Sequence, residues 1–215
     1  MRLVSILYRI ILLSLTGLLS VPLLSFAQQK AANATSIMEQ ISENLKGGSE
    51  CSFKINSYNK NGTLLLSERG VAVIYGEKFS VTINNGTKTV SDGKSQWFYN
   101  GANNEIIIGE ASSGGNPVDN PFALFSNPAL FYKIDYGKRQ GELREIVLSP
   151  RKEKRYSKIK LFLNNNSPER ISIEAYNGNR YNIELSRLVK RTNLPEKMFV
   201  LNPKEYKGAV VTDLR

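Results

Sequence analysis

The chain has 215 residues, of which 29 are Lys or Arg, 19 are Asp or Glu and none is His. Without histidine the chain cannot build a Ser-His-Asp triad, a Cys-His pair or a zinc site of the HExxH type. The net charge of +10 favours an anionic membrane surface or an acidic protein patch as partner. We therefore expect a binding protein rather than an enzyme, with no metal and no cofactor.

Residues 1–27 have the pattern of a secretory signal peptide. Arg2 and Arg9 give a positive start, an apolar run follows, and the segment ends in a small-x-small pattern at Ala27. An uncleaved membrane anchor is the alternative, but polar residues and a proline interrupt the run. We expect cleavage after Ala27 and export to the periplasm, which removes nucleic acid as a partner. The next residue, Gln28, is not the cysteine that lipid anchoring requires.

Removal of the signal leaves residues 28–215, enough chain for a single domain with a sizeable core. Cys51 is the only cysteine, so no internal disulfide can form and the apolar core must supply the stability. We expect Cys51 to be a small buried hydrophobe. The basic cluster at residues 151–155 is interpreted as a solvated loop.

The first predicted element is an amphipathic helix. Residues 28–34 are polar and small and are expected to form a flexible leader. Ser36 and Glu39 fit a capping box. Apolar residues then recur at helical spacing, at Ile37, Met38, Ile41 and Leu45. Two glycines at 47 and 48 predict the end of this helix.

A series of short strands follows, joined by turns of the Asn-Gly and Asp-Gly type. Such turns connect antiparallel neighbours, so the pattern predicts a meander. Its strands are expected at residues 53–57, 63–75, 78–83, 87–90, 96–99 and 105–108.

A short apolar helix interrupts the strands. Asn120 is a suitable N-cap and Pro121 suits the first helical position. The helix contains Phe122, Leu124 and Phe125, and a Gly/Ser stretch at residues 112–115 precedes it. It is either a core plug or a movable lid.

A second meander completes the strand pattern. Its strands are expected at residues 132–136, 142–148, 159–163, 170–176 and 181–185. Charged residues occupy alternate positions in many of them, which predicts one wet face and one apolar face. The fold class is therefore mainly β: a strongly curved antiparallel sheet or unclosed barrel, with an N-terminal helix and short lid helices over a hydrophobic cavity. An apolar cavity of this kind suits an acyl chain.

Ten apolar residues are the candidates for lining this cavity. They are Phe79, Val81, Trp97, Tyr99, Phe122, Leu124, Phe125, Leu148, Leu161 and Leu163. Strand parity decides two of them, because a shift of one residue exchanges the two faces of a strand. If Phe98 points inward, then Trp97 and Tyr99 point outward. For each candidate, plain core packing is as consistent with the pattern as contact with a ligand.

Several segments, in order along the chain, resemble the motifs of one family. Residues 90–100, VSDGKSQWFYN, are similar to an SDGK-x-x-WFY hairpin, and residues 120–125, NPFALF, to an N/T-P-F-x-L-L/I segment. Residues 147–151, VLSPR, resemble a V-L-T-P-K strand end. Residues 199–203 and 210–215 resemble an F-x-x-P and V-x-D-x-R ending. The family with these motifs is that of the outer-membrane lipoprotein carriers of the LolA type.

The resemblance implies an unclosed barrel of about eleven strands with a lid of short helices over a hydrophobic cavity. It also implies a monomeric periplasmic carrier of lipoprotein acyl chains, which receives them from an inner-membrane ABC transporter and passes them to an outer-membrane acceptor. In the family, an arginine before a Pro-x-x-Phe segment helps to close the lid, and Tyr75 stands at about that place here. A carrier of other lipids, a non-carrier exported interaction module and an unfamiliar hydrolase stay open as alternatives.

Overall fold

The structure is a computed structural model that describes residues 22–111, 117–118, 120–152, 155–186 and 188–215. The first 21 residues of the expected signal peptide and the Gly/Ser stretch at 112–115 lie outside these ranges. None of the helices within them combines the length and the hydropathy needed to cross a membrane.

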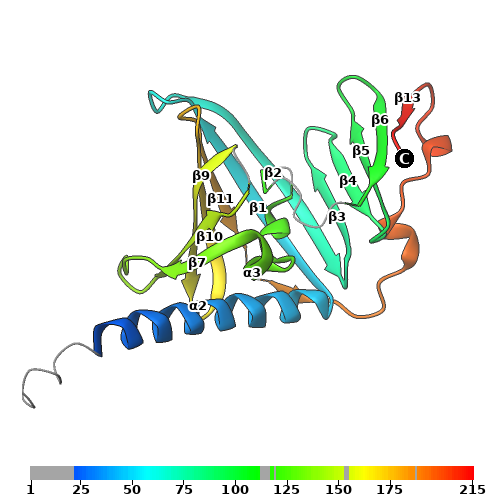
Figure 1. Cartoon of the computed structure of the whole chain (residues 1–215). Coiled ribbons are helices and arrows are strands. Elements are labelled where there is room, and N and C mark those ends of the chain that lie inside the picture. The colour runs from blue at the N-terminus through cyan, green and yellow to red at the C-terminus, as the bar shows by residue number, and fades with distance from the viewer. Residues whose placement is uncertain (1–21, 112–116, 119, 153–154, 187) are drawn as a thin grey trace, which may run out of the picture.

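A single 13-stranded sheet dominates the described part of the chain (Figure 1). Its strands are β1 (Ser49–Tyr58), β2 (Leu64–Tyr75), β3 (Lys78–Ile83), β4 (Lys88–Ser91), β5 (Ser95–Asn100), β6 (Glu105–Glu110), β7 (Tyr132–Tyr136), β8 (Arg144–Pro150), β9 (Tyr156–Asn164), β10 (Ser167–Ala175), β11 (Arg180–Leu185), β12 (Val189–Lys190) and β13 (Val210–Asp213).

The strand order confirms the predicted pair of meanders and the unclosed sheet. Along the sheet the order is β13-β6-β5-β4-β3-β2-β1-β11-β10-β9-β8-β7, with β12 paired to the start of β1. Strand β1 joins the two meanders because it pairs with both β2 and β11. The sheet ends at β7 and β13 and does not close. Strand β13 runs parallel to β6, which the pattern of antiparallel hairpins does not predict.

The N-terminal helix α2 spans Pro22–Lys46 and is longer than expected. The predictions of a flexible leader at 28–34 and of Ser36 as a helix cap are both wrong, because the helix runs through these positions. The residues before Ser36 include alanines and glutamines, which favour helix, and no Gly or Pro stands between Gln28 and Ser36 to end it. The C-terminal end is as predicted: Gly48 has φ +97 and donates its N–H to the carbonyl of Leu45 at 3.1 Å.

Four further short helices lie in the described residues. The 3-10 helix η1 (Pro121–Phe125) and the α-helix α3 (Pro128–Phe131) lie between β6 and β7 in the chain. Figure 1 shows α2 running across one end of the curved sheet, with α3 between α2 and the strands. The 3-10 helices η2 (Glu196–Phe199) and η3 (Pro203–Glu205) belong to the C-terminal segment, which leads to β13.

Two apolar cores lie on the two faces of the sheet. The larger core fills the inner face, which is the face toward α2 and η1, and it contains side chains from both meanders. The smaller core lies on the outer face of β4–β6. There Val90, Trp97, Ile106 and Ile108 pack with Leu201 from the C-terminal segment. The position of a residue relative to these two cores therefore decides whether it can reach a ligand held on the inner face.

Candidate apolar binding site beneath the 3-10 helix

The helix η1 is part of the larger core on the inner face. All five of its residues, Pro121–Phe125, are buried, and Leu124 is fully buried. The rings of Phe122 and Phe125 lie 6.3 Å apart, between centroids. Such a short segment exposes almost none of its apolar side chains to water, so it acts as a plug in the described structure.

The backbone of this plug is satisfied largely by its own residues. The side-chain oxygen of Asn120 accepts a hydrogen bond from the N–H of Phe122 at 3.1 Å. The N–H of Ala123 donates to the carbonyl of Asn120 at 3.0 Å, and the N–H of Ser126 donates to that of Ala123 at 3.2 Å. Because these bonds are local, η1 can leave the sheet without breaking a ladder hydrogen bond.

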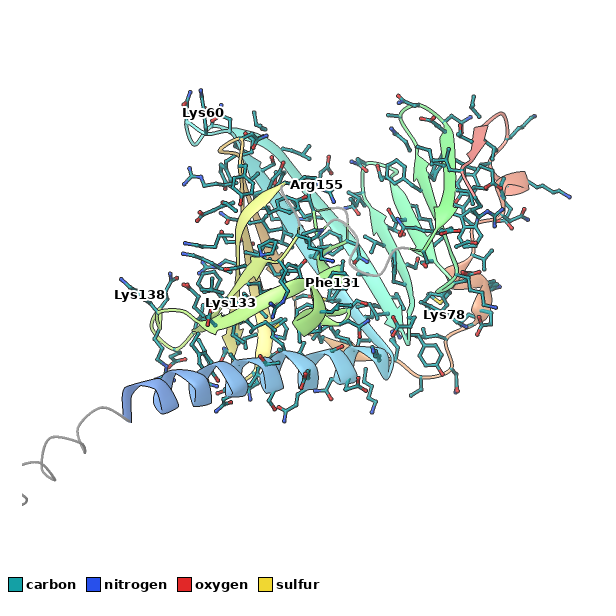
Figure 2. All side chains as sticks on the ribbon, viewed as in Figure 1. Lys60, Lys78, Phe131, Lys133, Lys138 and Arg155 are labelled. Atoms are coloured by element: carbon teal, nitrogen blue, oxygen red, sulfur yellow. The ribbon has the colours of Figure 1, made fainter. Side chains whose placement is uncertain are left out.

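The walls around the plug come from α2 and from the sheet. Helix α2 turns a stripe of buried apolar residues inward, at Ala34, Ile37, Met38, Ile41 and Leu45. The facing strands supply further fully buried side chains, among them Ile146, Leu148, Ile159, Leu161, Ile171 and Ile183. Phe131, the last residue of α3, is half-buried against the same core and lies near the middle of the molecule (Figure 2).

The inner face continues beyond the plug along β3–β6, and there it is less covered. Phe79 and Ile83 are half-buried and pack against the edge of the larger core. The register places Phe98 and Ile107 on the same face, since Val81 pairs with Thr89, Thr89 with Phe98, and Phe98 with Ile107. Both are also half-buried. Half-buried apolar side chains therefore continue along the inner face on β3, β5 and β6, with the buried polar residues Thr89 and Ser91 between them on β4.

Eight of the ten predicted residues lie together on the inner face. Val81, Phe122, Leu124, Phe125, Leu148, Leu161 and Leu163 belong to the larger core, and Phe79 packs against it. The structure does not bring Trp97 and Tyr99 to this place. Trp97 belongs to the smaller core on the outer face, and Tyr99 packs against that core with its ring 4.3 Å from the ring of Tyr206. The expected grouping of Trp97 and Tyr99 with Val81 is thus corrected.

The length of the loop between β3 and β4 explains why Trp97 and Tyr99 lie on the outer face. Asn85-Gly86 predicts a two-residue loop, which would pair Val81 with Val90. In the structure the loop has one more residue, since the N–H of Ile83 donates to the carbonyl of Thr87 at 2.8 Å. Gly86 supplies the positive φ of +90 that this longer loop needs. Val81 therefore pairs with Thr89, and Val90 and Trp97 turn to the outer face.

Phe98, Ile83 and Ile107 also lie on the inner face, and none of them is among the ten predicted residues. A signal for Phe98 was present in the alternation of the aromatic run, where it stands between Trp97 and Tyr99. Its use required the length of the Asn85-Gly86 loop, which the residue types alone leave ambiguous.

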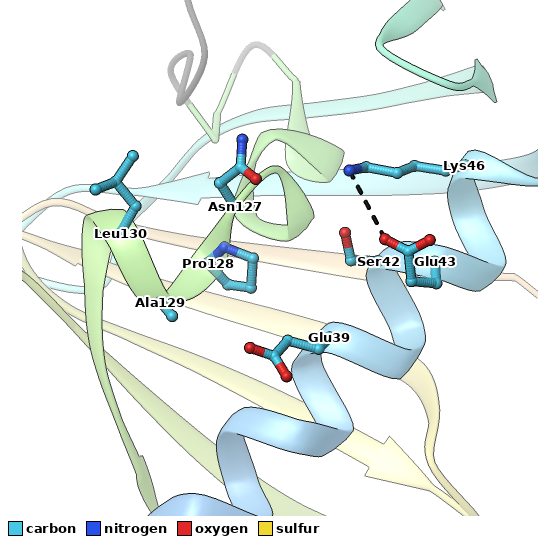
Figure 3. Close-up of a pocket in the computed structure, with 8 residues that line it drawn as sticks. All are labelled: Glu39, Ser42, Glu43, Lys46, Asn127, Pro128, Ala129 and Leu130. Atoms are coloured by element: carbon cyan, nitrogen blue, oxygen red, sulfur yellow. Dashed lines mark ion pairs between the residues drawn. The ribbon is translucent and has the colours of Figure 1, made fainter.

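A small hollow of about 260 Å³ lies between α2 and α3 (Figure 3). One wall is polar, with Glu39, Ser42, Glu43 and Lys46 of α2, and the other is the turn of α3 from Asn127 to Leu130. Nζ of Lys46 lies 3.8 Å from Glu43 and 3.1 Å from Glu77. Leu130 points away from α2 and is 67% exposed. On this side a surface hollow therefore separates part of α3 from α2.

Arg151, which follows β8, ties α3 to the sheet. Its Nε donates to the carbonyl of Ala129 at 3.3 Å, and its N–H donates to that of Phe131 at 2.9 Å. Both acceptors are backbone groups of α3. Tyr75, at the place of the family's arginine, stacks on Phe199 instead, with 6.5 Å between ring centroids.

The site contains no obvious chemistry beyond apolar contact. Cys51 is buried in the larger core, as expected, and burial raises the pKa of its thiol, although its hydrogen bonds to Ser186 act in the opposite direction. A raised pKa makes the thiol a poor nucleophile. In the part of the chain that the structure describes, no three Cys, Asp or Glu side chains gather as a metal site would require. Among the described residues, the site presents mainly buried apolar side chains.

A mostly antiparallel, open sheet whose apolar inner face is covered by helices is typical of proteins that bind apolar ligands. The family model described as outer membrane lipoprotein carrier protein LolA matches residues 53–202, which is more than half of the chain. The chain therefore belongs to the LolA family. A comparison with curated proteins finds no match.

A solved structure of low sequence identity shares the fold. An uncharacterized conserved protein from Thermus thermophilus is similar with a TM-score of 0.56 and 16% identity, over 84% of this chain and 99% of that one. The LolA superfamily protein NE2245 from Nitrosomonas europaea has a TM-score of 0.49 and 16% identity, over 78% of this chain and 97% of that one. Family and fold together are consistent with binding of a lipid or lipoprotein.

Proposed function

We propose that this protein is a periplasmic carrier that binds the acyl chains of lipoproteins on the inner face of its sheet and takes them from the inner to the outer membrane. The observation that carries the proposal is the plug Pro121–Phe125, a wholly buried apolar segment in the unclosed sheet of a LolA-family protein. An acyl chain can take the place of this plug.

The energetics of the exchange suit a carrier. Each buried CH₂ group contributes about 0.8 kcal/mol, so roughly ten methylenes gain about 8 kcal/mol. Displacing the plug exposes Phe122, Leu124 and Phe125, each of which contributes about 1.5–3 kcal/mol when buried. The two amounts nearly offset each other, and the exchange is reversible in either direction.

The proposal includes two partners. An inner-membrane ABC transporter would load the carrier, and an outer-membrane acceptor would unload it. A monomer serves this role, since both partners must reach the same opening. The hollow between α2 and α3 supports an opening movement there, because it separates the facing surfaces of the two helices.

A carrier of other acylated molecules or lipids is the second candidate. The observation that favours it is Tyr75, which stacks on Phe199 and makes no bond to the lid where the family uses an arginine. Here Arg151, in the loop between β8 and β9, binds the backbone of α3. This way of holding the helix differs from that of the family's arginine, and a different cargo would be consistent with the difference.

Native mass spectrometry of the protein purified from a periplasmic extract tests the proposal. We expect co-purified acylated protein and, in a second assay, release of lipoproteins from spheroplasts when purified carrier is added. Lipid without protein would favour the second candidate. If neither lipid nor acylated protein is found and no lipoprotein is released, the carrier proposal is rejected.

A further inference from the structure

Two hairpin turns meet at the end of the molecule that lies away from α2. They are the β1–β2 turn, with Lys60 and Gly62, and the β10–β11 turn, with Gly178. A Cβ atom added at Gly178 would lie 2.8 Å from Cβ of Lys60, and one added at Gly62 would lie 3.4 Å from Nη2 of Arg180. Tyr58 and Arg180 are paired across β1 and β11. The two turns therefore form one composite end, which protrudes in Figure 1.

This end exposes large apolar side chains in unusual number. Leu64, Leu65 and Leu66 are 52%, 57% and 47% exposed, and Tyr176 is 67% exposed. Consecutive exposed leucines on a protruding strand end do not contribute to either core, and exposed apolar groups of this kind mark interaction surfaces. We call the group Lys60, Leu64, Leu65, Leu66, Tyr176 and Arg180 the leucine tip.

Positive charge accompanies the leucines. Lys60 and Arg180 are exposed, and neither has an ion-pair partner among the residues that the structure describes. Arg155 is close by, because its carbonyl accepts the N–H of Tyr176 at 3.1 Å. Figure 2 shows Lys60 and Arg155 at the same end of the molecule, far from α2. The tip therefore combines leucine, tyrosine and cations.

We infer that the leucine tip docks on the surface of an anionic lipid bilayer. Leucines of a protruding ribbon can enter the boundary between headgroups and acyl chains, and tyrosine favours that boundary because it has an apolar ring and a polar end. Lys60 and Arg180 would pair with anionic headgroups. The overall charge of +10 steers the protein to the same surface.

The geometry favours a fluid surface over a protein partner. The register places leucines on both sides of the ribbon. Leu66 pairs with Ser57 and Leu64 with Tyr58, and because these neighbours in β1 point to opposite faces, Leu64 and Leu66 lie on opposite sides, with a register shift between the two pairs. One rigid protein surface covers only one side of such a ribbon, whereas lipid surrounds both. The inference does not rest on the proposed acyl cargo, because the tip is separate from the plug on the inner face.

Sedimentation with lipid vesicles tests the inference, with protein purified from cells that express the full chain and with its N-terminus established by mass spectrometry. We expect binding to vesicles of equal parts phosphatidylglycerol and phosphatidylcholine, weak binding to phosphatidylcholine alone, and loss of binding as salt is raised. Replacing Leu64, Leu65 and Leu66 together by Ser should reduce partitioning at least about tenfold. The pair Lys60→Gln and Arg180→Gln should reduce it to a similar extent.

Matched controls separate the tip from general surface effects. Val210→Ser with Val211→Ser removes exposed apolar groups from the edge strand β13. Lys138→Gln with Arg139→Gln removes the same charge at a distant loop, where Figure 2 labels Lys138. Both controls should bind vesicles as the unmodified protein does.

Three results would overturn the inference. The first is absence of binding to anionic vesicles, and the second is equal loss of binding in the tip variants and their controls. The third is binding to native membrane vesicles only, abolished when proteins on them are removed by protease, since the partner would then be a protein. Circular dichroism checks the fold, and the charge variant tests the inference independently if the leucine variant does not fold.

Discussion

Leu124 offers the sharpest test of whether the plug is displaced by a ligand. Its side chain is fully buried in the larger core, so Leu124→Ala should lower the free energy of unfolding of the ligand-free protein by about 2–5 kcal/mol. If a bound acyl chain displaces the plug, the ligand-bound form has already lost these contacts. The substitution then destabilises the bound form less than the free form, and affinity must rise.

The size of the rise follows from the same numbers. With a loss of about 3 kcal/mol in the free protein and none in the bound form, affinity would increase about a hundredfold, since 1.4 kcal/mol corresponds to a factor of ten. If Leu124 keeps half of its contacts in the bound form, the increase is about tenfold. Urea unfolding followed by circular dichroism gives the stability, and titration with a fluorescent long-chain fatty acid gives the affinity.

Leu201→Ala is the matched control, because Leu201 is 2% exposed but lies in the outer core. It should lower stability by a similar amount, about 2–5 kcal/mol, and leave fatty-acid affinity unchanged. An unchanged or weaker affinity in Leu124→Ala would refute displacement and make η1 a fixed part of the core. An equal rise in Leu201→Ala would show that general softening, and not the plug, controls binding.

Two further substitutions test the sheet. Gly70→Ala would bring Cβ to 2.6 Å from the carbonyl oxygen of Thr82, so we expect a loss of about 1–3 kcal/mol in unfolding free energy. Gly109→Ala is the control: its Cβ would meet nothing within 4 Å, and the unfolding free energy should change little. Hydrogen bonds from Arg215 lower the pKa of Asp213 from 3.8 to about 2. The stabilisation that these bonds give to the C-terminal end is therefore present above pH 3.8 and is lost as pH falls through about 2. NMR titration should show this pKa, and Arg215→Ala should return it toward 3.8; a pKa of Asp213 that stays low would contradict the pairing.

The order of strands could be predicted because each turn carried its own signal. Glycines with positive φ stand at 62, 76, 86, 93 and 178, between consecutive strands, and each marks an antiparallel hairpin. Strand β13 has no such local signal. It pairs in parallel with β6 across a long connection, and only the tertiary packing of the C-terminal segment brings it there.

The site could be predicted in kind but not in detail. The apolar helix at 120–125 was evident from its composition and its cap, and the structure places it in the larger core on the inner face. Which aromatic of β5 lies on the same face was not evident, because one residue in the Asn85-Gly86 loop exchanges Phe98 with Trp97 and Tyr99. The Asn-Gly pair fits loops of two or three residues, so these residue types do not choose between them.

The position of Trp97 on the outer face affects how the site can open. Because Trp97 lies on the outer face, strands β4–β6 have a core of their own with Leu201, and Tyr99 and Tyr206 extend it. These strands therefore do not depend on the plug for burial of their largest side chain. If η1 leaves the larger core, the outer core with Trp97 and Leu201 still holds these strands. The open half of the sheet can stay folded while its inner face exchanges plug for ligand.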